Sequence, residues 1–201
     1  LDAISGTSMG SVIAALYAVG MSADELMDVV LELEEETNEM KLFQRNPIRI
    51  LTKLSDRFSS GLVDGQIFEE MLQKYLDRYH VRYMKDVKIP LAIPAVDMIT
   101  GKIIVFVSHP ELFTPLEDHW EIVSDVTIAK AVRASCSFPF AIDACPLGEY
   151  KLTDGGVRMN LPSPLLKAYG VDEVIAVTMH NEEHYDKIDS FTGLANRMME
   201  L

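Results

Sequence analysis

The protein chain has 201 residues, of which 31 are acidic and 18 are basic, so its formal net charge is −13. This balance argues against nucleic acid as a partner, because Lys and Arg side chains on phosphates supply most of that affinity. It also gives no electrostatic attraction to anionic membranes. The sequence is 48% hydrophobic but contains no run of eighteen apolar residues, which is typical of a globular protein without a readable membrane span.

Helical and extended patterns alternate along the chain. Apolar residues at helical spacing and helix-ending glycines predict helices, and short apolar runs bounded by turn residues predict strands. We expect helices over residues 11–19, 21–40, 64–78, 125–134 and 162–169. We expect strands over residues 2–5, 150–153 and 173–178, the last one buried, and a strand, turn and strand around Thr100 and Gly101.

Local signals mark the ends of several of these elements. Ser22 and Glu25 have the spacing of a capping box at the start of the second helix, and Asp64 can cap the third helix. Pro90 and Pro94 favour strand starts, edges or bulges, because proline cannot donate a hydrogen bond to a central ladder.

The alternation of elements predicts a layered α/β fold with a mostly parallel sheet and helices on both faces. No internal repeat or low-complexity linker interrupts the sequence, so we expect one domain over residues 1–201. The acidic run at residues 32–36 is expected to be a solvated helix face. Residues 41–61 lack a clean period and are expected to form a surface excursion.

The residues Gly6-Thr7-Ser8-Met9-Gly10 spell G-x-S-x-G, the pattern of a nucleophile elbow. In such an elbow a serine stands on a sharp turn between a strand and a helix, and both flanking elements are predicted here. Gly6 and Gly10 are expected to let the strand and helix approach closely, because a Cβ at either position would clash. The amide of Met9 would point toward a developing oxyanion. Taken alone, the pattern leaves Ser8 either a nucleophile or a small residue in a tight turn.

A serine nucleophile needs a base, and two arrangements are open. Ser8, Asp154 and either His180 or His184 follow the chain order of a Ser-Asp-His triad. Alternatively, Asp154 ends a predicted strand just before two glycines and could take the serine proton directly. A third interpretation is that Asp154 and Gly155 simply form a turn.

Cysteine and histidine are not spaced like metal ligands. Cys136 and Cys145 lie nine positions apart, outside any C-x-x-C pair, and the five histidines are scattered. We therefore expect no metal and no other cofactor. The two cysteines are expected to be buried free thiols in a reducing compartment.

Three stretches together resemble the patatin-like phospholipase family. "ISGTSMGSVIAALYAVG" resembles its nucleophile segment, "AVRASCSFPFAI" at residues 131–142 resembles its A-x-x-A-S-x-x-x-P signature, and "YKLTDGGVRMNLP" at residues 150–162 resembles its D-G-G-x-x-x-N-x-P segment. Three motifs in order are far more specific than one elbow pattern. The resemblance implies a three-layer α/β/α fold and hydrolysis of lipid acyl esters by a Ser–Asp dyad.

Carried onto this sequence, the resemblance makes Ser8 the nucleophile and Asp154 the base, with no histidine required. Gly155 and Gly156 would let the backbone turn so that Asp154 reaches Ser8, and Asn160 would hold the shape of the loop with Pro162. The compact chain and the lack of a readable signal peptide suggest a small bacterial-type cytoplasmic member, which would act peripherally at membranes if its substrate is a lipid.

Family members also carry a glycine-rich G-G-G-x-R-G loop before the elbow, and its amides form most of the oxyanion hole. No such loop is present in these 201 residues. We therefore expect a truncated chain with little or no esterase activity by itself, because loss of one oxyanion donor costs about 10²–10³ in rate. The C-terminal residues 190–201 resemble the start of a helix that is cut off.

The substrate is less defined by the sequence. An acyl groove could be lined by Ala14, Ala15, Phe138, Phe140 and Leu161, although each of these could equally belong to the core. Nothing in the sequence chooses among a phospholipase A, a lysophospholipase, a neutral-lipid esterase and a transacylase. A catalytically silent binding module is the alternative from another class.

Overall fold

The structure is a computed structural model that describes residues 1–39, 63–139 and 141–178. The predictions that lie outside the described residues concern the excursion at 41–61, Phe140, His180, His184 and the C-terminal segment 190–201.

The described residues form a mixed α/β fold around a six-stranded sheet. Its strands are β1 (Ile4–Ser5), β2 (Leu91–Asp97), β3 (Ile103–Val107), β4 (Trp120–Val123), β5 (Cys145–Leu147) and β6 (Tyr150–Asp154). The order is β4-β3-β2-β6-β5, and β1 pairs with β2 beside β6. Only the β1–β2 and β3–β4 pairs of this sheet are parallel, whereas β2–β3, β2–β6 and β5–β6 are antiparallel.

The prediction of a mostly parallel sheet is therefore wrong. Two of the antiparallel pairs are hairpins, and their connections are far too short for the crossover that parallel neighbours need. The β2–β3 hairpin turns at Gly101, whose φ of 72° lies in the left-handed region that favours glycine. This strand, turn and strand was predicted and is confirmed.

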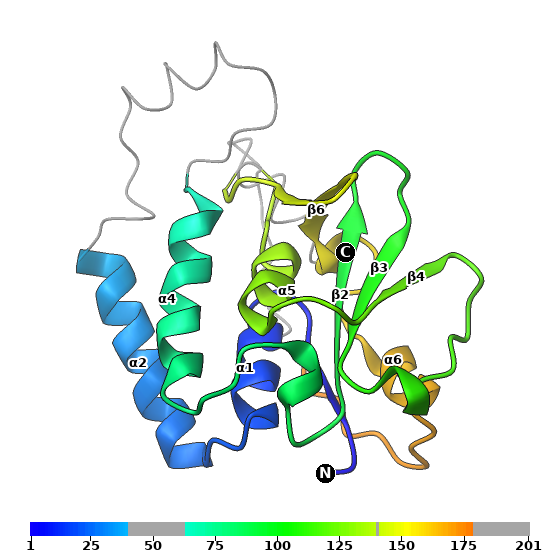
Figure 1. The fold of residues 1–201 in the computed structure, drawn as a ribbon, viewed down its shortest axis with the longest axis horizontal. Coiled ribbons are helices and arrows are strands. Elements are labelled where there is room, and N and C mark those ends of the chain that lie inside the picture. The colour runs from blue at the N-terminus through cyan, green and yellow to red at the C-terminus, as the bar shows by residue number, and fades with distance from the viewer. Residues whose placement is uncertain (40–62, 140, 179–201) are drawn as a thin grey trace, which may run out of the picture.

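Helices cover both faces of the sheet unequally (Figure 1). The helices are α1 (Met9–Ala18), α2 (Ala23–Glu39), α4 (Gly65–Asp77), α5 (Ile128–Ser135) and α6 (Ser163–Ala168). The first four pack together on one face, and α6 lies on the other face. Each of the five predicted helices is present, with ends that shift by one to three residues.

Strand β2 sits at the centre of the molecule and is buried along its whole length. Leu91 and Ile93 face the cluster that includes α1, α4 and α5, while Ala92 faces the second cluster with Leu165 of α6. This alternation is the period-two pattern of a strand with two covered faces. The result is a fully buried strand that lies directly beside the elbow.

Pro94 lies inside this central strand, so the expectation that it avoids such a position is wrong. The amide of Asp97 and the carbonyl of Leu91 form hydrogen bonds on the β3 side of the strand. The backbone N–H and C=O groups of odd-numbered residues of β2 therefore point toward β3, and those of even-numbered residues such as Pro94 point toward the opposite edge. On that side the neighbour changes from β1, which pairs with residues 91 and 92, to β6, which pairs with residues 95–97. The missing N–H of Pro94 therefore falls where no ladder bond is required.

The predicted helix caps are present. Ser22 and Glu25 form a reciprocal capping box, in which the Ser22 amide donates to Glu25 at 2.8 Å and the Glu25 amide donates to the Ser22 hydroxyl at 3.3 Å. The Ser22 amide, the Tyr79 hydroxyl and the Ser22 hydroxyl together lower the pKa of Glu25 to about 2. Asp64 accepts a hydrogen bond from the Gln66 amide at 2.9 Å and caps α4.

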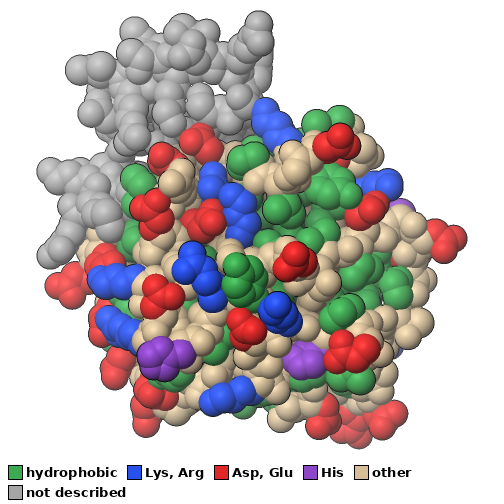
Figure 2. Space-filling view, viewed as in Figure 1, with side chains coloured by type: hydrophobic (Ala, Val, Ile, Leu, Met, Phe, Trp, Pro, Cys, Tyr) green, Lys and Arg blue, Asp and Glu red, His purple; other side chains and the backbone are tan. Residues whose placement is uncertain are grey.

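The acidic face of α2 is mostly exposed and forms ion pairs with basic side chains of α4. Glu32 and Glu36 form ion pairs with Arg78 and Lys74 of α4 at 3.1 and 2.6 Å. Figure 2 shows the acidic and basic side chains of this region interspersed over α2 and α4. The predicted solvated face is confirmed for Glu32, which stays exposed in its ion pair, whereas Glu36 is half-buried beside α4.

The predicted buried strand at residues 173–178 is also wrong. The structure assigns no strand there, and Ile175 and Val177 are each 85% exposed. The segment has the apolar composition of a strand, but no neighbouring strand pairs with it among the described residues.

Candidate active site

Ser8 occupies a sharp turn between β1 and α1. Its backbone has φ 54° and ψ −130°, a conformation that residues with a side chain rarely adopt and that costs about 1–3 kcal/mol. Local hydrogen bonds hold the turn: the Gly10 amide donates to the Thr7 carbonyl at 2.9 Å, and Ser11 donates its amide and its hydroxyl to the Ser8 carbonyl at 2.8 and 2.6 Å. The predicted strand–serine–helix geometry is present.

The hydroxyl of Ser8 donates to Oδ2 of Asp154 at 2.6 Å, although the two residues are 146 positions apart. Asp154 is the last residue of β6 and pairs with Ala95 of the buried central strand. Its other oxygen, Oδ1, accepts from the Gly156 amide at 2.7 Å. Both carboxylate oxygens are therefore oriented by the D-G-G segment and the elbow.

Asp154 is buried, and its burial raises the pKa of the carboxyl above the ordinary value of 3.8. The hydrogen bonds from Ser8 and Gly156 lower the pKa but do not cancel the effect of burial. A carboxylate with a raised pKa holds a proton more readily than an exposed one. This is the electrostatic requirement for a base that takes a proton from a hydroxyl group.

The glycines of the two motifs have different roles. A Cβ on Gly6 would lie 2.8 Å from the Ser11 amide nitrogen and closer still to the Gly10 carbonyl, so strand and helix meet there without space for a side chain. A Cβ on Gly155 would likewise meet the backbone of Pro94. A Cβ on Gly10 would have no atom within 4 Å. The prediction of a clash is therefore correct for Gly6 and wrong for Gly10.

The loop after Asp154 is fastened to the elbow by two hydrogen bonds. The Thr7 hydroxyl donates to the Met159 carbonyl at 2.8 Å, and the Ser5 hydroxyl donates to the Pro162 carbonyl at 3.1 Å. The sequence predicts that Asn160 and Pro162 hold the shape of this loop; Asn160 is exposed, whereas Pro162 is buried and its carbonyl accepts the Ser5 bond. In the structure the loop backbone itself makes these contacts.

A residue that sequence reasoning missed is Ser135, the last residue of α5. It is buried, and its hydroxyl accepts the Ser8 amide at 3.0 Å. The only available signal was its place within the "AVRASCSFPFAI" signature, to which the sequence gave no role. Met9, the expected oxyanion donor, begins α1, and amides in the first helical turn have no intrahelical acceptor.

Among the described residues, those expected to line a groove do not form one surface. Ala14 and Ala15 are buried within the core cluster, so they belong to the interior. Phe138 is half-buried and Leu161 is exposed. Larger exposed apolar side chains near the elbow are those of Met9 and Ile13, one helical turn apart on α1.

Cys136 and Cys145 are free and buried, as predicted. The thiol of Cys136 lies 3.8 Å from the Ser11 hydroxyl, and burial together with the charge of Asp154 raises its pKa, so it is a thiol and not a thiolate. Across residues 1–39, 63–139 and 141–178, no group of three or more His, Cys, Asp or Glu side chains could hold a metal ion. The same part of the chain contains no helix long and apolar enough to cross a bilayer.

Comparison with known proteins agrees with the motifs. A family model described as patatin-like phospholipase matches residues 1–166, and the chain therefore belongs to the patatin-like phospholipase family. It is 28% identical over 192 residues to the uncharacterized protein YqhO of Bacillus subtilis, a match that covers 90% of this chain and 62% of YqhO. It is also 26% identical over 181 residues to the uncharacterized NTE family protein MT2641 of Mycobacterium tuberculosis, covering 89% of this chain and 25% of that protein.

Proposed function

We propose that this chain carries the catalytic centre of a lipid acyl-ester hydrolase, with Ser8 as nucleophile and Asp154 as base. The 2.6 Å hydrogen bond between the Ser8 hydroxyl and Asp154 Oδ2, at a strained elbow, is the observation that carries the proposal. Membership of the patatin-like phospholipase family supports an ester of a lipid as the substrate class. The chain spans 62% of the length of YqhO, so the activity of the whole protein is part of the proposal.

The reaction proceeds in two half-reactions. In the first, Asp154 accepts the Ser8 proton while Oγ bonds to the ester carbonyl carbon, and the same proton then passes to the leaving alcohol as the C–O bond breaks. In the second, Asp154 takes a proton from water, the resulting hydroxide attacks the acyl-enzyme, and the proton returns to Ser8 as the fatty acid leaves. The Met9 amide, at the start of α1, donates to the oxyanion in both.

The geometry favours this dyad over a triad. In a Ser-His-Asp arrangement an imidazole stands between the hydroxyl and the carboxylate. Here the Ser8 hydroxyl already donates directly to Asp154, which leaves no place for an imidazole between them. His180 and His184, the histidines of the alternative, lie outside the described residues.

Active-site labelling tests the proposal. A fluorophosphonate probe should label Ser8 in the full-length protein that contains this sequence, and Ser8→Ala should abolish both labelling and ester hydrolysis. Absence of labelling in a folded protein would identify a catalytically silent module. The double variant His180→Ala/His184→Ala is the control: it should retain wild-type activity, whereas a loss of several orders of magnitude would indicate a triad.

The acyl part of the substrate is proposed to be apolar. Met9 and Ile13 expose large hydrophobic side chains on α1 directly after the nucleophile, and burying such area favours hydrocarbon over polar acyl groups. A series of p-nitrophenyl esters of increasing chain length should show kcat/KM rising with length. Fatty-acid release from phospholipid and from lysophospholipid, measured separately, distinguishes a phospholipase from a lysophospholipase. Formation of a new ester when an acceptor alcohol is added would indicate a transacylase. A cytoplasmic location with peripheral membrane contact remains a prediction.

A further inference from the structure

One short segment at the end of α5 contacts both residues of the proposed dyad. The Ser8 amide donates to the Ser135 hydroxyl at 3.0 Å. Two residues further on, the Ser137 carbonyl accepts from the Asp154 amide at 3.0 Å and from the Thr153 hydroxyl at 2.8 Å. The elbow and the strand that bears the carboxylate are thus joined through residues 135–137, in addition to the bond between Ser8 and Asp154 themselves.

The contact with Ser135 acts on the strained residue of the elbow. Ser8 is the only non-glycine residue besides His80 with a positive φ among the described residues, and it precedes the first turn of α1, so its amide takes no part in the helix ladder. Ser135 is fully buried. Its hydroxyl therefore supplies an acceptor that solvent does not readily replace, and it fixes the peptide plane from which the Ser8 side chain projects.

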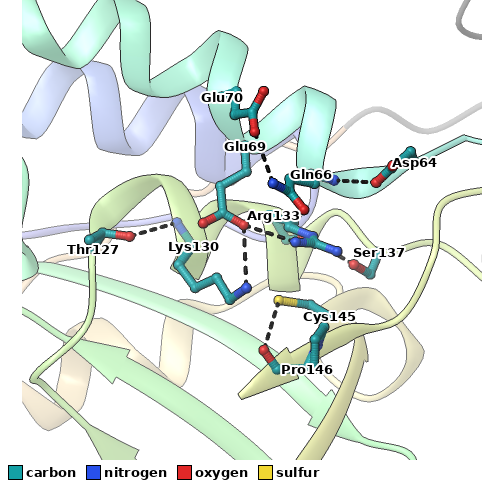
Figure 3. A network of polar contacts seen from close by, with 10 residues as sticks. All are labelled: Asp64, Gln66, Glu69, Glu70, Thr127, Lys130, Arg133, Ser137, Cys145 and Pro146. Atoms are coloured by element: carbon teal, nitrogen blue, oxygen red, sulfur yellow. Dashed lines mark hydrogen bonds and ion pairs between the residues drawn. The ribbon is translucent and has the colours of Figure 1, made fainter. Parts of the chain in front are cut away.

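The segment is held on its other side by α4. Glu69 of α4 contacts Arg133 at 3.0 Å and Lys130 at 3.4 Å, and the Ser137 hydroxyl donates to the Arg133 carbonyl at 2.9 Å (Figure 3). Arg133 is itself buried. Because α5 is anchored to α4 in this way, residues 135–137 form a fixed support and do not simply follow the elbow.

We infer that Ser135 is a positioning residue for the hydrolysis proposed above, on which this inference rests. Its hydroxyl fixes the Ser8 amide, while the Ser137 carbonyl fixes Asp154 from the same helix end, so that residues 135–137 set the separation of nucleophile and base. Ser135 does not touch the reacting atoms and acts through Ser8.

The test is the variant Ser135→Ala in the full-length protein, with Ser108→Ala as the matched control, because Ser108 is also buried and its hydroxyl also accepts a backbone amide, that of Leu91 at 2.8 Å. Ser135→Ala removes the acceptor of the Ser8 amide and is expected to lower kcat about 10- to 100-fold, the scale of a small misplacement of reacting groups, with KM changed less than twofold. Ser108→Ala removes a comparable buried acceptor that is bonded to neither Ser8 nor Asp154, and it is expected to leave kcat close to wild type. If Ser135→Ala does not fold, Ser135→Cys replaces it, since sulfur is a weak acceptor, and should lower kcat in the same direction.

The pH profile separates positioning from general damage to the fold. The hydrogen bond from Ser8 lowers the pKa of Asp154 against the effect of burial. When this bond lengthens, the pKa of Asp154 rises, so the acid limb of the kcat/KM profile should move to higher pH in Ser135→Ala and not in Ser108→Ala. The Cys136 thiol, on which the Asp154 charge acts, stays protonated because its pKa is also raised. An unchanged kcat and acid limb in Ser135→Ala would overturn the inference.

A crystal structure distinguishes failure of this inference from failure of the proposed function. If wild type and Ser8→Ala are equally inactive, the proposed function has failed, and the positioning role is then decided by geometry alone. The Ser8 Oγ to Asp154 Oδ2 separation, 2.6 Å here, should exceed hydrogen-bonding distance in Ser135→Ala. An unchanged separation would refute the role of Ser135 whatever the activity.

Discussion

Replacing Gly6 by Ala should damage the elbow far more than the same change at Gly10. A Cβ on Gly6 would lie 2.8 Å from the Ser11 amide nitrogen, whereas ordinary contact begins at 3.4 Å, so β1 and α1 must separate by at least 0.6 Å, the difference between these values. The obstructing atoms are backbone and cannot rotate away. We expect a loss of at least about 1–3 kcal/mol in unfolding free energy, the usual cost of overpacking.

The same displacement moves Ser8, which lies two residues further on. A shift approaching 1 Å at a reacting group can reduce the rate about 100-fold. Gly10→Ala is the matched control, because its Cβ would enter open space within α1. Alanine in a helix is favoured over glycine by up to about 1 kcal/mol, so Gly10→Ala should leave the protein as stable as wild type or more stable.

Urea unfolding of the two variants and of wild type measures the free energies directly, and fluorophosphonate labelling of Ser8 reports the geometry of the nucleophile. The expected order of stability is Gly10→Ala, then wild type, then Gly6→Ala. Equal stability of Gly6→Ala and wild type, or a larger loss in Gly10→Ala than in Gly6→Ala, would show that the close approach of β1 and α1 is not as described.

Three further predictions concern charged groups. Asp154→Asn should reduce ester hydrolysis about 10²–10⁴-fold. Burial raises the pKa of Asp154, so the ionised wild-type carboxylate costs stability once the pH has risen from the ordinary 3.8 through the raised value. At pH 7 the variant should therefore unfold at a urea concentration no lower than that of wild type. Glu69→Gln should lower the free energy of unfolding, measured in urea, by about 1–3 kcal/mol, because it leaves buried Arg133 without its carboxylate. Its control, Glu36→Gln in a more exposed ion pair, should lower the same free energy by less than about 1 kcal/mol. The pKa of Glu25 is lowered to about 2, so the stability difference between wild type and Glu25→Gln should be present above pH 4.5, shrink as pH falls, and vanish near pH 2.

Signals that act within a few residues were read correctly from the sequence. The capping box of Ser22 and Glu25 and the cap at Asp64 depend on neighbours two or three positions away, and the turn at Gly101 depends on its own φ. The elbow around Ser8 belongs to the same class, because a glycine–serine–glycine pattern between a strand and a helix is local.

Contacts between distant residues were decided only by the tertiary structure. Strand direction depends on which strands become neighbours, so alternating elements suggested a parallel sheet where hairpins made it mostly antiparallel. Ile175 and Val177 have the composition of a buried strand, but a strand also needs a partner. Gly10 looked like a close-approach glycine, yet open space surrounds its Cβ position.

For the candidate site, the sequence by itself determined the chemical groups: a serine on an elbow, an aspartate before two glycines, and the family motifs that link them. The 2.6 Å contact between Ser8 and Asp154 and the support from Ser135 exist only once β6 and α5 are packed beside the elbow. The physical reason is that a hydrogen bond between residues more than 100 positions apart depends on how the whole core is packed, and no local pattern encodes that distance.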